Sequence, residues 1–284
     1  ISIGLVGSEM CIRDSSGAAA AAGIPAVVSC GIWPGVSALL AAEAVQQLGG
    51  PQVCDRVDLS FFTAGSGGAG PTIVSATFLL LATRVLTFVD GRLACKEPWT
   101  ERRIIDFGDG VGRQACFLLD NPDVPTTVES LGVANCASRF GTAPAAWNNL
   151  FAAIKLLPDD LLLNRDAMQR LARFSMPIIR AVDQWVGATN AMRIDACSKG
   201  GEGNGTPDRI TLRCVHADLQ DCVGQATAAF AMEMLRGRSG HSTAEQTTAE
   251  QTIPAGVWYP AELQATARNN ILNVAREQAL VWEV

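Results

Sequence analysis

Three glycine-containing segments could form a binding site, because each lies between an apolar run typical of a strand and a run typical of a helix. They span residues 30–37, 63–72 and 138–144. Open sheets bind ligands beyond the carboxyl ends of their strands, where glycines admit close approach and helix N-termini present N–H groups to anions. The pattern therefore predicts a site for an acidic small molecule. Tight strand–helix turns explain it equally well.

Arg139 is the residue of these segments best suited to grip a carboxylate. It follows a predicted strand, Val133–Ala137, and precedes the Gly-Thr-Ala-Pro turn that starts at Gly141. A guanidinium there could donate two parallel hydrogen bonds to a substrate. A salt bridge inside the protein is an equally good interpretation. Asp106 and Asp120 fall on predicted hairpins and are expected to be solvated or turn residues.

Several other chemistries have no basis in the sequence. Only two histidines occur, of which His216 is expected to be packed or at the surface, and the single tyrosine, Tyr259, has Leu263 four residues later. A histidine-rich metal site and a Tyr-x-x-x-Lys pair are thus excluded, and neither a G-x-S-x-G elbow nor a P-loop occurs. The nine scattered cysteines never have C-x-x-C spacing, which favours reduced thiols. We predict no metal site and identify no catalytic acid or base.

The surrounding pattern predicts an α/β fold, with a mixed, largely antiparallel sheet flanked by helices. Strands are expected at 24–30, 57–61, 192–196 and 210–214, hairpins within 85–119 around Asp90-Gly91 and Gly108–Gly110, and helices at 36–48, from 71, and at 144–157, 164–185 and 218–235. In the helix 164–185, which Pro177 should kink, six residues predict one stripe facing the core: Met168, Leu171, Phe174, Ile178, Val182 and Trp185.

Two stretches are expected to lie outside the fold. Residues 1–15 contain IGLVGS, which imitates a nucleotide-binding loop, but no G-x-G-x-x-G unit follows. This stretch looks like translated sequencing-adapter readthrough. The pentapeptide TAEQT occurs twice in succession from Thr243, which predicts a disordered loop near 238–254.

Four stretches of the sequence resemble the saccharopine dehydrogenase-like oxidoreductases, especially their plant, algal and cyanobacterial branch. They are GIPAVVSCGIWPGVSALLAAE, FFTAGSGGAGPTIVSATFLLL, IIDFGDGVGR and SRFGTAPAAWNNL. The resemblance implies that residues 16–33 end a truncated Rossmann domain, which leaves a remnant of that fold, and that 34–284 form a substrate and dimerisation domain.

The same resemblance assigns roles to individual residues. The segment beside the nicotinamide of NADP or NAD would comprise Cys30, Gly31, Ile32, Trp33, Pro34 and Gly35. The substrate side would comprise Thr63, Gly65, Gly67, Gly68, Arg139, Phe140 and Gly141. Because the pyrophosphate loop has no counterpart here, NADP or NAD is expected to bind only the full-length protein.

The predicted function is that of a fragment of an NAD(P)-dependent oxidoreductase, which would act on a carboxylate- or amine-bearing small molecule. The alternative is a non-catalytic module that binds a small molecule or a partner on the same scaffold. The net charge is −6, the pI is about 5.0, and no Lys/Arg block occurs, so nucleic acid is not an expected partner. A homodimer without a transmembrane segment is expected. By resemblance the location would be intracellular, in plastid or cytoplasm.

Overall fold

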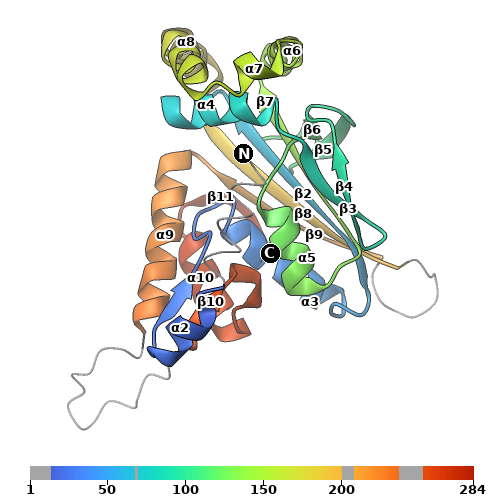
Figure 1. Cartoon of the computed structure of the whole chain (residues 1–284), viewed down its shortest axis with the longest axis vertical. Coiled ribbons are helices and arrows are strands. Elements are labelled where there is room, and N and C mark those ends of the chain that lie inside the picture. Colours follow the sequence, from blue (N-terminus) through green and yellow to red (C-terminus); the bar gives the residue numbers. More distant parts are fainter. Residues whose placement is uncertain (1–13, 68–69, 200–207, 237–251) are drawn as a thin grey trace.

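A large mixed sheet organises the molecule (Figure 1). The computed structural model describes residues 14–67, 70–199, 208–236 and 252–284. Within these ranges the sheet has the order β11-β9-β8-β2-β7-β3-β4, and β6 adds β5 through a further pairing with β7. The strands are β2 (Cys54–Ala64), β3 (Val85–Val89), β4 (Arg92–Lys96), β5 (Arg103–Asp106), β6 (Arg113–Leu118), β7 (Asn135–Ala143), β8 (Thr189–Ser198), β9 (Arg209–His216) and β11 (Ala279–Glu283).

Strand direction confirms the predicted fold class. The neighbours β2 and β7 run parallel, whereas the other pairings described for this sheet are antiparallel. The expected hairpins form: Asp90 and Gly91 join β3 to β4, and the segment around Gly108–Gly110 joins β5 to β6. Asp90, Gly91, Gly108 and Gly110 all adopt positive φ, as such tight turns require.

The helices form two groups. One packs on a face of the sheet around the main core and comprises α3 (Val36–Leu48), α5 (Asp123–Leu131), α9 (Leu219–Leu235) and α10 (Ala265–Ala275). The other gathers at one end of the molecule and comprises α4 (Pro71–Leu80), α6 (Ala145–Ile154), α7 (Asp159–Leu162) and α8 (Arg165–Val186) (Figure 1). No helix of the described ranges is long and apolar enough to cross a bilayer.

A second, two-stranded sheet joins distant parts of the chain. The expected strand at 24–30 is β1 (Pro25–Val27), and it pairs in parallel with β10 (Gly256–Trp258). The short helix α2 (Ser16–Ala21) contacts both strands, whereas η1 (Pro260–Glu262), which follows β10, packs against α3 and α5. The division at residues 33 and 34 stays a prediction, but the chain near residue 256 returns to the segment assigned to the first unit.

The prediction for the third glycine-containing segment was wrong. The expected strand Val133–Ala137 begins and ends later, as β7, so Ser138 to Ala143 are strand residues and not a loop. Their backbone groups join the ladder with β2, in which Ser60 stands opposite Arg139 and Thr63 opposite Thr142. The Gly-Thr-Ala-Pro sequence indicated a turn, but pairing along the full length of β2 overrides that local signal.

The stripe predicted on the helix 164–185 is only partly buried. Met168 lies in the core at 2% exposure, whereas Phe174 is 78% and Trp185 86% exposed. Helix α8 packs against α4 through Met168 and Ala172, whereas Phe174, Ile178 and Trp185 face solvent. The periodicity located the helix correctly but overstated the width of its buried face.

Most residues of the two stretches that were expected to lie outside the fold fall outside the described ranges. Residues 1–13 lie outside the described ranges, as do residues 237–251 of the expected loop. The end of that loop is described and differs from the prediction, because Ile253 is buried in the main core.

Candidate functional site

A cavity of about 310 Å³ lies between the sheet and the helices gathered at its end. This volume is at the lower end of the range for small-molecule sites, roughly 300–1,000 Å³. The sheet contributes Phe61 and Thr63 of β2 and alternate residues of β7, and α4, α6 and α8 complete the wall. The residues from β7, from α6 and from the β6–α5 connection are Ser138, Phe140, Thr142, Trp147, Leu150, Phe151, Leu119, Asp120, Asn121 and Pro122.

The cavity brings together part of the site expected from the sequence. Trp33, Pro34, Thr63, Gly65 and Phe140 line it, so all three segments contribute. The other expected residues do not form the wall, and Gly68 lies outside the described ranges. Those described but absent from the wall are Cys30, Gly31, Ile32, Gly35, Gly67, Arg139 and Gly141.

The first glycine-containing segment, residues 30–37, forms a tight turn that is closed by backbone hydrogen bonds. Gly31 N–H donates to Pro34 O at 2.9 Å, and Val36 N–H donates to Gly31 O at 3.0 Å. Gly35 has φ 136°, and a Cβ there would lie 2.1 Å from Gly31 O, so only glycine allows this closure. Trp33 is thereby held against Phe61, with ring centroids 5.0 Å apart. The turn has a clear structural role, which is to place Trp33 in the wall.

The second segment is held tightly by its neighbours. Ser66 donates its N–H to Asp183 of α8 at 2.7 Å, and a Cβ on Gly65 would lie 2.2 Å from an Asp183 oxygen. Gly67 O accepts the N–H of Leu219 at 2.8 Å. The positive φ values of Gly65 and Gly67 thus serve a compact turn that ties α8 and α9 to the end of β2.

Arg139 lies on the face of the sheet opposite the cavity. Successive side chains of a strand alternate between faces, and Phe140 is in the wall. The guanidinium is buried, at 2% exposure, and donates to Asp58 at 3.3 Å and to Glu101 at 3.1 Å. Burial lowers the pKa of Arg139, whereas the two carboxylates oppose that shift. These contacts match the internal ion pair that the sequence left open.

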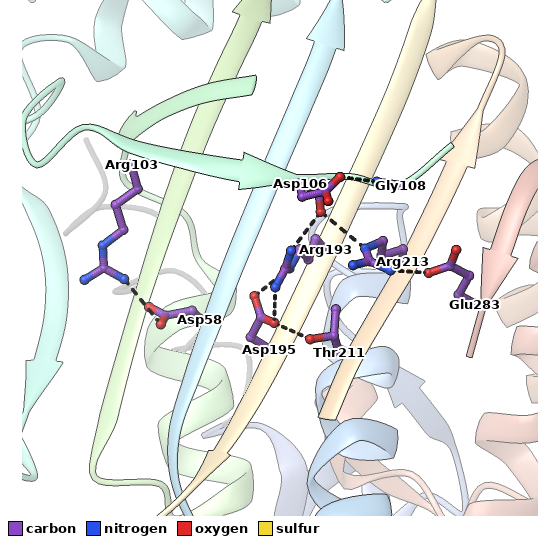
Figure 2. A network of polar contacts seen from close by, with 9 residues as sticks. All are labelled: Asp58, Arg103, Asp106, Gly108, Arg193, Asp195, Thr211, Arg213 and Glu283. Atoms are coloured by element: carbon purple, nitrogen blue, oxygen red, sulfur yellow. Dashed lines mark hydrogen bonds and ion pairs between the residues drawn. The ribbon is translucent and has the colours of Figure 1, made fainter. Parts of the chain in front are cut away.

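Strand β5 runs across this opposite face and is fixed there by charged groups (Figure 2). The carbonyl oxygen of Asp106 accepts hydrogen bonds from Arg193 at 2.8 Å and from Arg213 at 3.2 Å. Arg193 forms two hydrogen bonds of 2.8 Å with Asp195, whose carboxylate also accepts the hydroxyl of Thr211. All members of this network belong to this chain.

Gly141 lies close to β6, where a Cβ would approach Ala115 O to 2.3 Å.

Asp120 is a cavity residue whose position the sequence did not indicate. It was expected to be solvated or in a turn, but it is only 7% exposed. Its carboxylate accepts the N–H of Leu86 at 2.9 Å at the beginning of β3. The usable signal was its place directly after the apolar run Cys116–Leu119, at a strand end. No described wall residue is Lys, Arg or His, so Asp120 is the titratable group there.

The cysteines and the histidine of the described ranges lie outside the cavity wall. Burial raises the pKa of the Cys30 thiol to about 12, which makes it a poor nucleophile. His216 is packed at the end of β9 at 3% exposure, and burial lowers its pKa. The eight cysteines of the described ranges are free thiols, and no group of acidic, His and Cys side chains there could hold a metal ion.

The helix that follows β1 does not fit the phosphates of a dinucleotide. Helix α3 follows β1, as a phosphate-binding helix would, but the N–H groups of its first turn already have backbone acceptors. Val36, Ser37 and Ala38 donate to Gly31, Ile32 and Gly35, respectively. A pyrophosphate needs free N–H groups at such a helix end, so this helix cannot provide its site.

Comparison with known proteins identifies the fold. No family model matches the chain, and no curated protein matches it in sequence. Among solved structures, the fold is similar to that of apo saccharopine dehydrogenase (L-Glu forming) from Saccharomyces cerevisiae. The TM-score is 0.54 at 10% identity, over 96% of this chain and 76% of that protein. At this identity the similarity establishes the fold, which is of the saccharopine dehydrogenase type.

Proposed function

We propose that this chain is the substrate-holding portion of an oxidoreductase, with the cavity as its substrate site. The observation that carries the proposal is a cavity of about 310 Å³ built on a saccharopine dehydrogenase-type fold. The wall joins the Trp33-Pro34 turn to the end of β2 and the middle of β7. In this proposal the turn is the part of the chain nearest the nicotinamide of NADP or NAD.

The dinucleotide phosphates are assigned to residues that precede this chain in a longer protein. The reason is the first turn of α3, whose N–H groups are already used within the chain. In this proposal the residues of the cavity wall shape the cavity, hold the substrate and exclude water. Asp120 is the titratable side chain among the described wall residues, and the proposal gives it no role in proton transfer.

A module that binds without turnover is the second candidate. It is favoured by the same wall, since a single carboxylate that already accepts a backbone N–H provides little acid–base chemistry. The homodimer also stays a prediction. A dimer mass in light scattering at micromolar concentration would support it, and a monomer mass would reject it.

Two measurements test the oxidoreductase proposal. Titration calorimetry of this chain with NADPH should give no binding stronger than about 1 mM, because the phosphate contacts are missing. A low micromolar dissociation constant would show that the nucleotide site has been misplaced. A longer form with a complete dinucleotide domain should transfer hydride between the nicotinamide and a small-molecule substrate, followed as NADPH formed or consumed. Substrate binding without any change in NADPH would favour the binding module.

A further inference from the structure

The wall of the cavity is mainly hydrocarbon. Aromatic rings stand on two sides: Trp33 contacts Phe61, and Phe78 meets Phe151 edge to face with centroids 6.2 Å apart. Between them lie aliphatic side chains of α4, α6 and α8: Ile73, Val74, Leu80, Leu150 and Ile179. Ile73 and Leu150 are about half exposed, so the rim of the cavity is apolar as well as its interior. Such a wall gains free energy by removing hydrocarbon from water.

The charges around the cavity disfavour an acidic ligand. No described wall residue carries a positive charge, and Asp120 contributes a carboxyl group. Arg139, the cation expected to bind a carboxylate, is on the opposite face of the sheet and paired with Asp58 and Glu101. A carboxylate in this cavity would lose its water without gaining a cation, which is costly.

Three hydroxyl groups of the wall can accept a hydrogen bond, because their protons are already used within the chain. The hydroxyls of Thr63 and Thr142 donate to Gly65 O at 3.4 and 3.2 Å, and that of Ser175 donates to Ala172 O at 2.9 Å. Each oxygen keeps a lone pair for another donor. A neutral ligand with an O–H group can donate to these three oxygens, whereas a carboxylate has no proton to donate to them.

From these three observations we infer that the cavity binds an uncharged, mainly hydrocarbon molecule that carries a hydroxyl group. This inference names the substrate class of the proposed function and rests on it for the assumption that the cavity is the substrate site. It differs from the sequence prediction, which was a carboxylate- or amine-bearing small molecule. Selectivity comes from the apolar wall and from the absence of a cation among the described wall residues.

Three probes with one hydrocarbon chain test the charge preference directly. Decanol, decanoate and decylamine are titrated into the chain by calorimetry at neutral pH, at concentrations at which each probe is monomeric. Decanol should bind at least tenfold more tightly than decanoate and more tightly than decylamine. Decanoate binding as tightly as decanol would overturn the inference. Decylamine binding most tightly would also overturn it and assign the cavity to amines through Asp120.

A pair of matched variants places the binding in the cavity. Ala76 lies on α4 in the wall and is exposed, so Ala76→Phe should fold normally and fill the opening. Ala152 is an exposed residue of α6 outside the wall, and Ala152→Phe is the control. Decanol affinity should fall at least tenfold in the first variant and stay unchanged in the second. Equal affinity in both variants would show that decanol binds elsewhere, and would reject the inference.

The outcome is separable from that of the proposed function. Decanol binding is measured without a cofactor, whereas oxidoreduction by a longer form is measured as NADPH formed from NADP⁺ with alcohols, or as NADPH consumed with carbonyl compounds. If decanol binds the cavity and no turnover occurs in either direction, the oxidoreductase proposal fails and the ligand class stands. If NADPH is consumed with an acidic substrate while decanol does not bind, the ligand class fails and the oxidoreductase stands.

Discussion

Along β7, Ser138, Phe140 and Thr142 line the cavity, whereas Arg139 and Gly141 lie on the opposite face of the same strand. The cavity side is apolar, and its described wall has no cation. The opposite side is crossed by β5 and is rich in ion pairs formed within the chain (Figure 2). The difference shows that charge on the described part of this sheet holds its strands together, whereas the cavity that we propose as the ligand site is lined mainly by hydrocarbon. Substitutions on the two faces should therefore have separable effects.

The largest expected effect is that of Arg139→Met. Removal of the buried guanidinium deletes its hydrogen bonds to Asp58 and Glu101, while these carboxylates keep Arg103 and Lys96, respectively. The free energy of unfolding should fall by about 3 kcal/mol, since two hydrogen bonds to charged groups are lost. Denaturant unfolding measures the loss. Arg103→Met is the control: Arg103 contacts the same Asp58 but is 44% exposed, and its loss should cost about 1 kcal/mol or less.

Ligand binding makes this test specific to the comparison. At a temperature where Arg139→Met remains folded, its affinity for decanol should equal that of the unchanged chain, because Arg139 is outside the wall. If Arg139→Met left the free energy of unfolding unchanged but abolished binding of an acidic ligand, Arg139 would belong to a ligand site and not to the ion pairs that hold the sheet.

Gly141→Ala should have the next largest effect. The added methyl group would meet Ala115 O at 2.3 Å, and backbone on both sides limits relaxation. We expect a loss of about 2 kcal/mol in thermal or denaturant unfolding, as for other overpacked sites. Gly224→Ala on α9 is the matched control, because nothing lies within 4 Å of a Cβ there, and alanine should raise stability by up to about 1 kcal/mol. Equal stability of the two variants would contradict the close approach of β6.

A smaller effect on the free energy of unfolding is expected from protonation of His216. No carboxylate contributes to the pKa shift of this residue. Burial lowers its pKa below the usual 6.5, and a backbone hydrogen bond to Gln278 opposes this only in part. Because the unfolded chain binds a proton near pH 6.5 and the folded chain does not, stability from this group is complete above that pH. It is lost as the pH falls from about 6.5 toward the lower folded value.

The measurement is the stability difference between the unchanged chain and His216→Gln as a function of pH. The difference should shrink as the pH falls from 7 to 5.5, since only the unchanged chain carries the penalty of a buried imidazole. A difference that is independent of pH would mean that the imidazole is accessible to solvent or already protonated in the folded state.

Local patterns predicted the elements well where the pattern and the tertiary contacts agree. The helix 36–48 was predicted with the bounds of α3, since its apolar side faces the main core and glycines flank it. The hairpins followed from Asp90-Gly91 and Gly108–Gly110, whose backbone conformation is a local property. The strands at 192–196 and 210–214 were located by alternation and prove longer, as β8 and β9.

The site was harder to predict because it depends on which face of a strand each residue occupies. The sequence brought Trp33, Thr63 and Phe140 together correctly, but it read the segment around Arg139 as a loop. In a strand, a shift of one residue moves a side chain to the other face. Asp120 was missed because it is buried where its carboxylate accepts the N–H of Leu86, which is 34 residues away in the sequence. Pairing of β1 with β10 joins residues about 230 positions apart, and no local signal announces it.

The most direct test of the central claim is a crystal structure of the chain grown with decanol. The hydrocarbon should lie on the cavity face, between Phe61 and Phe140 and under α4, with its hydroxyl near Thr63 or Thr142. Asp58, Glu101 and Arg139 should keep their contacts on the other face. Decanol beside Arg139, or bound only at the exposed side of α8 with the cavity unfilled, would contradict the division of roles between the two faces.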